Sequence, residues 1–123
     1  METILLVDDD AAVCNCLNEI LTRFGYQVVT RSNAQSALEY LRAAGTVSLV
    51  IADYRMPGMS GLEMVRHVRE MNAKMPVVML TGHEDFESYL CAQSLGNMQY
   101  VMKPVGAWEL QKIIKNALTT GTC

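Results

Sequence analysis

The sequence predicts an α/β fold: a single doubly wound (βα)5 domain, in which a five-stranded parallel sheet carries helices on both faces. Short apolar runs alternate with longer segments of helical periodicity from one end of the chain to the other, which is typical of this architecture. A length of 123 residues and a hydrophobic fraction of 50% are enough for one continuous core. We therefore expect residues 1–123 to form one domain.

The expected strands are five short apolar runs. Several are rich in β-branched residues and apolar on both faces, as in strands that helices cover on both sides. In chain order they span residues 3–7, 27–30, 49–52, 77–80 and 99–102. Each is followed by a segment of helical periodicity, which gives five strand–helix pairs.

The expected helices span residues 11–24, 34–44, 61–71, 86–95 and 107–118. Most of them carry an apolar stripe at helical spacing. The first begins after Asp10, which we interpret as an N-cap and not as a ligand. It ends before Gly25, where a C-terminal cap is expected. The fourth has the weakest stripe, because Gln93 and Ser94 interrupt it.

Composition excludes several classes of protein. A formal net charge of −3 and a pI near 5.3 leave no broad basic surface for nucleic acid, so direct DNA binding by this chain is not expected. The apolar runs are far shorter than the roughly 20 residues that cross a bilayer, and the N-terminus lacks the basic start of a signal peptide. We expect a cytoplasmic protein. The cysteines show no CxxC spacing and are expected to be reduced.

Polar residues follow the expected strands at their carboxyl ends, which is the edge where doubly wound sheets bind ligands. Asp8 and Asp9 follow the first strand, Asp53 the third, Thr81 the fourth and Lys103 the fifth. Neighbouring strands lie about 4.8 Å apart, so acids after the first and third strands could share one Mg²⁺ ion. This set suits phosphoryl transfer, in which the catalyst mainly positions the partners and neutralises charge.

Four motifs at these strand ends resemble, in order and spacing, the receiver domains of two-component response regulators. They are Val7-Asp8-Asp9, Asp53 with Met56-Pro57-Gly58-Met59-Ser60-Gly61, Thr81-Gly82, and Tyr100-Val101-Met102-Lys103-Pro104. The resemblance covers the whole chain. It implies a flavodoxin-like sheet in the order 2-1-3-4-5, as in chemotaxis regulators.

The resemblance also implies the chemistry of the site. Asp53 would accept a phosphoryl group from the phosphohistidine of a histidine kinase, in a reaction that depends on Mg²⁺. Asp9, Asp53 and the backbone carbonyl of Arg55 would bind the ion, and Asp8 would hold a coordinating water. Thr81 would hydrogen-bond the bound phosphoryl group.

Further roles follow from the same resemblance. Lys103 would pair with a phosphoryl oxygen, aimed into the site by a cis peptide bond at Pro104. Thr81 and Tyr100 would form the switch, although Tyr100 also fits an ordinary core aromatic. The face built from the fourth helix, fifth strand and fifth helix would signal to an output domain or effector. The protein would be a phosphorelay switch with self-catalysed phosphotransfer and slow autodephosphorylation only, and not an enzyme.

Other interpretations remain open. The chain could be a non-phosphorylated pseudo-receiver that acts as a docking module. An Mg²⁺-dependent aspartyl-phosphate phosphatase would need a second acid where Arg55 stands, and a flavodoxin-like FMN module would need donors where Asp8 and Asp9 stand. Trp108 would either anchor a partner or fold onto the loop 103–106. The sequence fits a free-standing regulator, with or without a phosphorylation-dependent homodimer, and equally the N-terminal part of a longer one.

Overall fold

The computed structural model describes residues 2–43, 46–54, 56, 58–72, 74–81, 98–102 and 106–120. Its sheet has five parallel strands in the order β2-β1-β3-β4-β5, which confirms the expected topology. The strands are β1 (Thr3–Val7), β2 (Gln27–Arg31), β3 (Leu49–Asp53), β4 (Val77–Thr81) and β5 (Met98–Met102). The helices are α1 (Ala11–Arg23), α2 (Ala34–Ala43), α3 (Gly61–Met71) and α5 (Ala107–Thr120).

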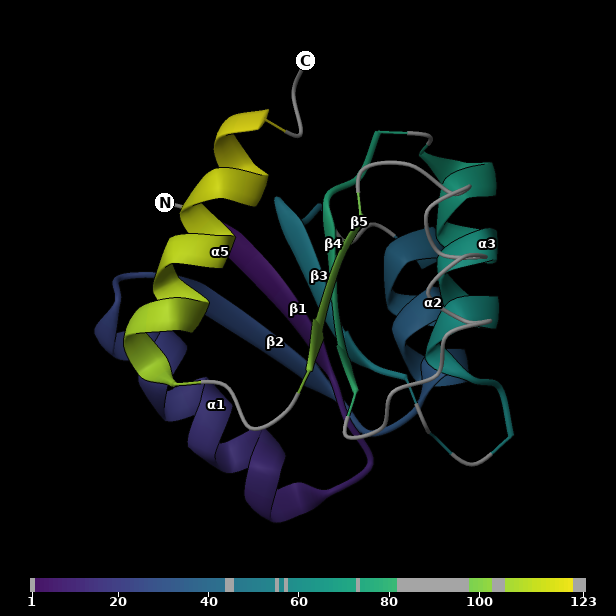
Figure 1. The fold of residues 1–123 in the computed structure, drawn as a ribbon. Coiled ribbons are helices and arrows are strands. Elements are labelled where there is room, and N and C mark those ends of the chain that lie inside the picture. Colours follow the sequence, from purple (N-terminus) through teal and green to yellow (C-terminus); the bar gives the residue numbers. More distant parts are fainter. Residues whose placement is uncertain are drawn as a thin grey trace.

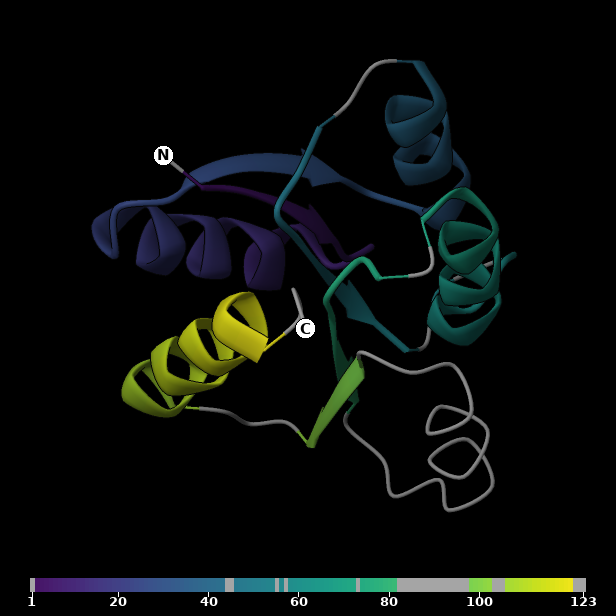
Figure 2. The same ribbon diagram turned by 90° about the horizontal axis from the view of Figure 1, so that it is seen from above.

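The described helices cover both faces of the sheet. Figures 1 and 2 show α1 and α5 on one face and α2 and α3 on the other. The helix expected at residues 86–95 lies outside the described residues.

Three strands are one residue longer at the carboxyl end than the apolar pattern predicts, because they continue through Arg31, Asp53 and Thr81. Strand pairing uses backbone groups, so a polar side chain need not end it.

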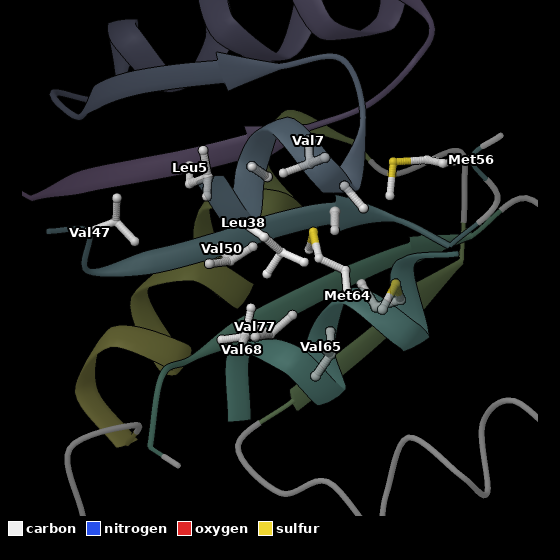
Figure 3. Packing of buried hydrophobic residues seen from close by; sticks show 14 residues of the cluster. Leu5, Val7, Leu38, Val47, Val50, Met56, Met64, Val65, Val68 and Val77 are labelled. Atoms are coloured by element: carbon white, nitrogen blue, oxygen red, sulfur yellow. The ribbon is translucent and has the colours of Figure 1, made fainter. Parts of the chain in front are cut away.

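Alternate residues of each central strand enter different core layers. Leu5 and Val7 of β1 pack with α2 and α3, as Figure 3 shows, whereas Ile4 and Leu6 pack with α1 and α5. All four side chains are at most 1% exposed. This two-sided burial explains why the strands read as continuous apolar runs instead of alternating ones.

Helix α1 is fixed at both ends by the predicted caps. The Asp10 carboxylate accepts hydrogen bonds from the backbone N–H groups of Ala12 (3.0 Å) and Val13 (3.2 Å). At the other end Gly25 has φ = 97°, and the N–H of Tyr26 donates to the carbonyl of Leu21 at 3.2 Å. Both cap predictions are confirmed. Within the described ranges, no helix is long and apolar enough to cross a membrane.

Candidate functional site

Three carboxylates gather at the carboxyl ends of the two central strands. Val7 of β1 is in register with Ala52 of β3, so the residues that follow each of them lie side by side. Asp8, Asp9 and Asp53 each offer an oxygen atom, and these oxygens all lie within 4.8 Å of one another. The predicted convergence of these acids is confirmed.

The three acids differ in exposure. Asp8 is 2% exposed, Asp53 is half-buried and Asp9 is exposed. The backbone around Asp8 is fixed, because its N–H donates to the carbonyl of Arg31 (3.1 Å) and its Oδ1 accepts from the N–H of Asp10 (2.9 Å). A buried carboxylate is costly unless hydrogen bonds or a cation compensate its charge. The cluster is thus a rigid anionic site with one buried member.

Charge and donor chemistry fit a hard divalent cation. Two unit charges about 4.8 Å apart repel by about 3 kcal/mol at an effective dielectric near 20. Carboxylate oxygens are the ligands that Mg²⁺ prefers, usually one or two per ion with water or phosphate oxygens completing the shell. The set formed by Asp8, Asp9 and Asp53 fits such an ion. The carbonyl of Arg55, the expected backbone ligand, lies outside the described residues.

The start of α3 packs directly on the backbone that carries Asp53. The N–H of Gly61 donates to the carbonyl of Tyr54 at 2.8 Å. A Cβ at Gly61 would collide with the carbonyl oxygen of Asp53 and come within 2.8 Å of the Met79 sulfur. The sequence placed Gly61 only at the start of the expected helix 61–71 and in the motif after Asp53. One sequence feature could have indicated this role. Ser60 already caps the helix, so the glycine that follows it is not needed for the turn and points instead to a close contact.

Strand β4 brings further predicted residues to the same edge. Asp53 is in register with Leu80, and the N–H of Tyr54 donates to the carbonyl of Leu80 at 2.8 Å. The backbone of Thr81 therefore follows beside the acidic cluster. Thr81 is in turn paired with Met102 of β5.

Other predicted site residues are placed only in part. Tyr100 lies in β5, where its backbone is paired with that of Met79. Lys103 and Pro104 lie outside the described residues. The roles of Thr81, Tyr100, Lys103 and Pro104 stay predictions.

An open hollow of about 340 Å³ adjoins the cluster between the starts of α1 and α2 and the end of β2. Its wall includes Asp8, Asp9, Cys14 and Asn15. Burial raises the pKa of the Cys14 thiol above its ordinary value, and the negative charge of Asp8 raises it further. Cys14 therefore remains a neutral thiol near pH 7, and both Cys14 and Cys16 are free, as expected.

Trp108 stands apart from the cluster. It lies in the first turn of α5 and is 82% exposed, whereas Leu110 and Ile114 on the opposite side of the helix are at most 1% exposed. Trp108 therefore lies on the solvent-facing side of α5. This exposure favours a role for Trp108 as an anchor for a partner over one in which the indole is buried within the protein.

Comparison with known proteins identifies the class. Residues 4–115 match the sequence profile of the response regulator receiver domain, and the chain belongs to this family. A solved structure of a response regulator receiver domain protein (CheY-like) from Methanospirillum hungatei JF-1 superimposes with a TM-score of 0.94 at 29% identity. The alignment covers 99% of this chain and 97% of that one.

Curated relatives are longer transcriptional regulators. The chain is 33% identical over 115 residues to the transcriptional regulatory protein ZraR of Klebsiella oxytoca, which covers 94% of this chain and 26% of that protein. It is 34% identical over 116 residues to the DNA-binding transcriptional regulator NtrC of Rhizobium meliloti, with 94% and 24% covered. The chain thus spans about a quarter of the length of these two relatives.

Proposed function

We propose that this chain, as one domain over residues 1–123, is a phosphorylatable switch of a two-component system. It receives a phosphoryl group on Asp53 from the phosphohistidine of a sensor kinase or phosphotransfer protein. The observation that carries the proposal is the acidic cluster: three carboxylates with oxygens within 4.8 Å, at the strand ends of a receiver fold. Such a cluster is anionic enough to need a cation before it can accept a further anion.

The proposed step is a transfer between two nucleophiles. A carboxylate oxygen of Asp53 attacks phosphorus and forms a P–O bond. The P–N bond of phosphohistidine breaks, its electron pair returns to the imidazole, and an acyl phosphate remains on Asp53. Later attack by water releases inorganic phosphate and restores the carboxylate, so the protein resets itself without acting on any other substrate and is not an enzyme.

Each residue of the site has a proposed part in this step. Asp9, Asp53 and the carbonyl of Arg55 would hold Mg²⁺, with Asp8 acting through a water. When bound, the ion neutralises charge on the phosphoryl oxygens. Thr81 and Lys103 would hold those oxygens by charge-assisted hydrogen bonds.

Partners would bind the face built from residues 86–95, β5 and α5. Thr81 and Tyr100 would respond to the charge added by phosphorylation and change that face. In this proposal the protein works in the cytoplasm, where it meets the kinase. The two relatives described above are named as transcriptional regulators, which supports an output domain or effector as the recipient of the signal. Contact with DNA would belong to that recipient, because this chain carries a net charge of −3.

Intact-protein mass spectrometry after incubation with acetyl phosphate and Mg²⁺ tests the proposal. We expect a gain of about 80 Da that disappears with EDTA and in Asp53→Ala. Asp10→Ser is the matched control, because Asp10 belongs to the same acidic run but caps α1 and lies outside the cluster. An unmodified wild-type protein that also fails to bind beryllofluoride would instead identify a docking module without phosphorylation.

A further inference from the structure

Helix α5 presents an exposed stripe opposite its buried face. Leu110, Ile114 and Ala117 are at most 5% exposed, and they hold the helix against the sheet. Three exposed residues follow the spacing i, i+4, i+7 on the far side: Trp108, Lys112 and Lys115. At 3.6 residues per turn these three lie within an arc of about 60° and extend about 10 Å along the helix. We call them the Trp108 stripe.

The aromatic member is unusually open to solvent. In the described part of the chain only Trp108 and Met71 are exposed large hydrophobic side chains, at 82% and 41%. Met71 lies at the end of α3, which covers the other face of the sheet (Figure 2). Scattered exposed apolar residues are common, so exposure alone is weak evidence. Tryptophan, however, is enriched among the residues that dominate the energy of protein interfaces.

Charge makes the stripe specific. The chain has a net charge of −3, yet the stripe contains two lysines and no acid. Across the residues that the structure describes, neither lysine forms an ion pair. Glu109 is the nearest acid in sequence: helical phase places it about 100° from Trp108 and about 60° from Lys112, beside the stripe, and among the described residues it forms no ion pair with Lys112. A partner surface complementary to this stripe would carry acidic side chains opposite the two lysines and an apolar side chain opposite Trp108.

We propose that the Trp108 stripe docks an acidic amphipathic segment of a partner protein. One apolar side chain of that segment packs on the indole, and its carboxylates face Lys112 and Lys115. The inference rests on the proposed function, since the segment belongs to the effector that receives the signal. A nucleic acid would also meet an aromatic ring beside lysines, but two cations on an acidic protein neutralise too few phosphates.

The chain carries its own probe for this interaction, because Trp108 is its single tryptophan. The test titrates the full chain with a designed helical peptide of about 14 residues that presents leucine and several glutamates on one face. A second peptide has each glutamate replaced by lysine. We expect the acidic peptide to shift Trp108 emission to the blue and to bind more weakly as salt is raised. An equal or larger shift with the basic peptide overturns the proposal.

Variants localise the site. Lys112→Glu with Lys115→Glu should weaken binding of the acidic peptide at least about 5-fold, because two attractions become repulsions. The matched control is Arg42→Glu with Arg66→Glu, which makes the same change in net charge at exposed positions on α2 and α3. Equal losses in the two double variants would mean that only net charge matters, and the proposal would be wrong.

The indole is tested by anisotropy of a fluorescein-labelled acidic peptide. Trp108→Ala should weaken binding at least about 10-fold, whereas Met71→Ala should leave it unchanged. Preference for a single-stranded oligonucleotide over the acidic peptide, or an emission shift caused by self-association alone, would each overturn the proposal.

Phosphoryl mass gain is measured on the same samples. Peptide binding without mass gain contradicts only the proposed function, and mass gain without peptide binding contradicts only this inference.

Discussion

At the level of single residues, the three consecutive aspartates after β1 differ sharply in environment. Asp8 is buried and Asp9 is exposed, and both belong to the acidic cluster. Asp10 instead points its carboxylate at the first N–H groups of α1. That helix end carries a partial positive charge, which favours an anion there. Position relative to the helix start therefore decides which acid caps and which acids form the cluster.

Removal of the Asp10 carboxylate should affect stability and not phosphoryl acceptance. We expect Asp10→Ala to lower the free energy of unfolding by about 1 kcal/mol, because two N–H groups lose their acceptor. Asp10→Ser should recover most of the loss. Urea denaturation followed by circular dichroism measures the change, and the mass assay follows phosphorylation. A variant of unchanged stability that no longer accepts phosphate would show that Asp10 is a ligand.

At the level of elements, the contact between α3 and the end of β3 fixes the candidate phosphoacceptor. Ser60 and Glu63 form a capping box that starts the helix, and Gly58 makes the preceding turn with φ = 80°. Gly61 then lets the helix approach the Asp53 backbone without a side chain between them. The direction of the Asp53 side chain therefore depends on helix packing as well as on its own strand.

A methyl group at Gly61 should disturb both packing and chemistry. We expect Gly61→Ala to lower the free energy of unfolding by about 1 to 3 kcal/mol, as overpacked sites do, and to slow phosphorylation by acetyl phosphate. Gly106→Ala is the control, since a Cβ there meets nothing within 4 Å. Denaturation and the time course of mass gain are the measurements. Wild-type rates in Gly61→Ala would show that Asp53 is positioned independently of α3.

Sequence patterns predicted the elements well because each depends on local signals. Apolar runs, helical stripes and caps at Asp10 and Gly25 led to the sheet and to the described helices. The carboxyl ends of β2, β3 and β4 were missed by one residue, because backbone pairing continues beneath polar side chains. The role of Gly61 was also missed. A glycine directly after the cap Ser60 hints at a close approach, but its contacts with Asp53, Tyr54 and Met79 are set by the tertiary fold.

At the level of the whole molecule, the acidic cluster links cation binding to global stability. The cluster joins the ends of β1 and β3, so repulsion among its carboxylates acts against the centre of the sheet. A ligand that binds only the folded state stabilises it in proportion to the logarithm of its concentration. Binding of a cation at this one site should therefore raise the free energy of unfolding of the whole protein.

Magnesium should stabilise the protein, and loss of one carboxylate should reduce that effect. At about 100 times the dissociation constant, the ion should add about 2.7 kcal/mol to the free energy of unfolding. Asp53→Asn should gain less free energy of unfolding from Mg²⁺ than wild type does, because an amide replaces one of the three carboxylates. Thermal unfolding with and without Mg²⁺ measures both. An identical Mg²⁺ shift in Asp53→Asn would place the ion elsewhere.

The position of β1 between β2 and β3 has a consequence for synthesis on the ribosome. This first strand pairs with both β2 and β3, so its two edges are satisfied only once residue 53 has been made. After that the sheet extends in one direction only, first by β4 and then by β5. At each later stage the newest strand is one free edge and β2 is the other, and for a time the growing edge is β4, whose Val77–Leu80 run is fully apolar. A chain that pauses there would expose an apolar strand edge, which favours aggregation, and pairing with β5 would cover that edge.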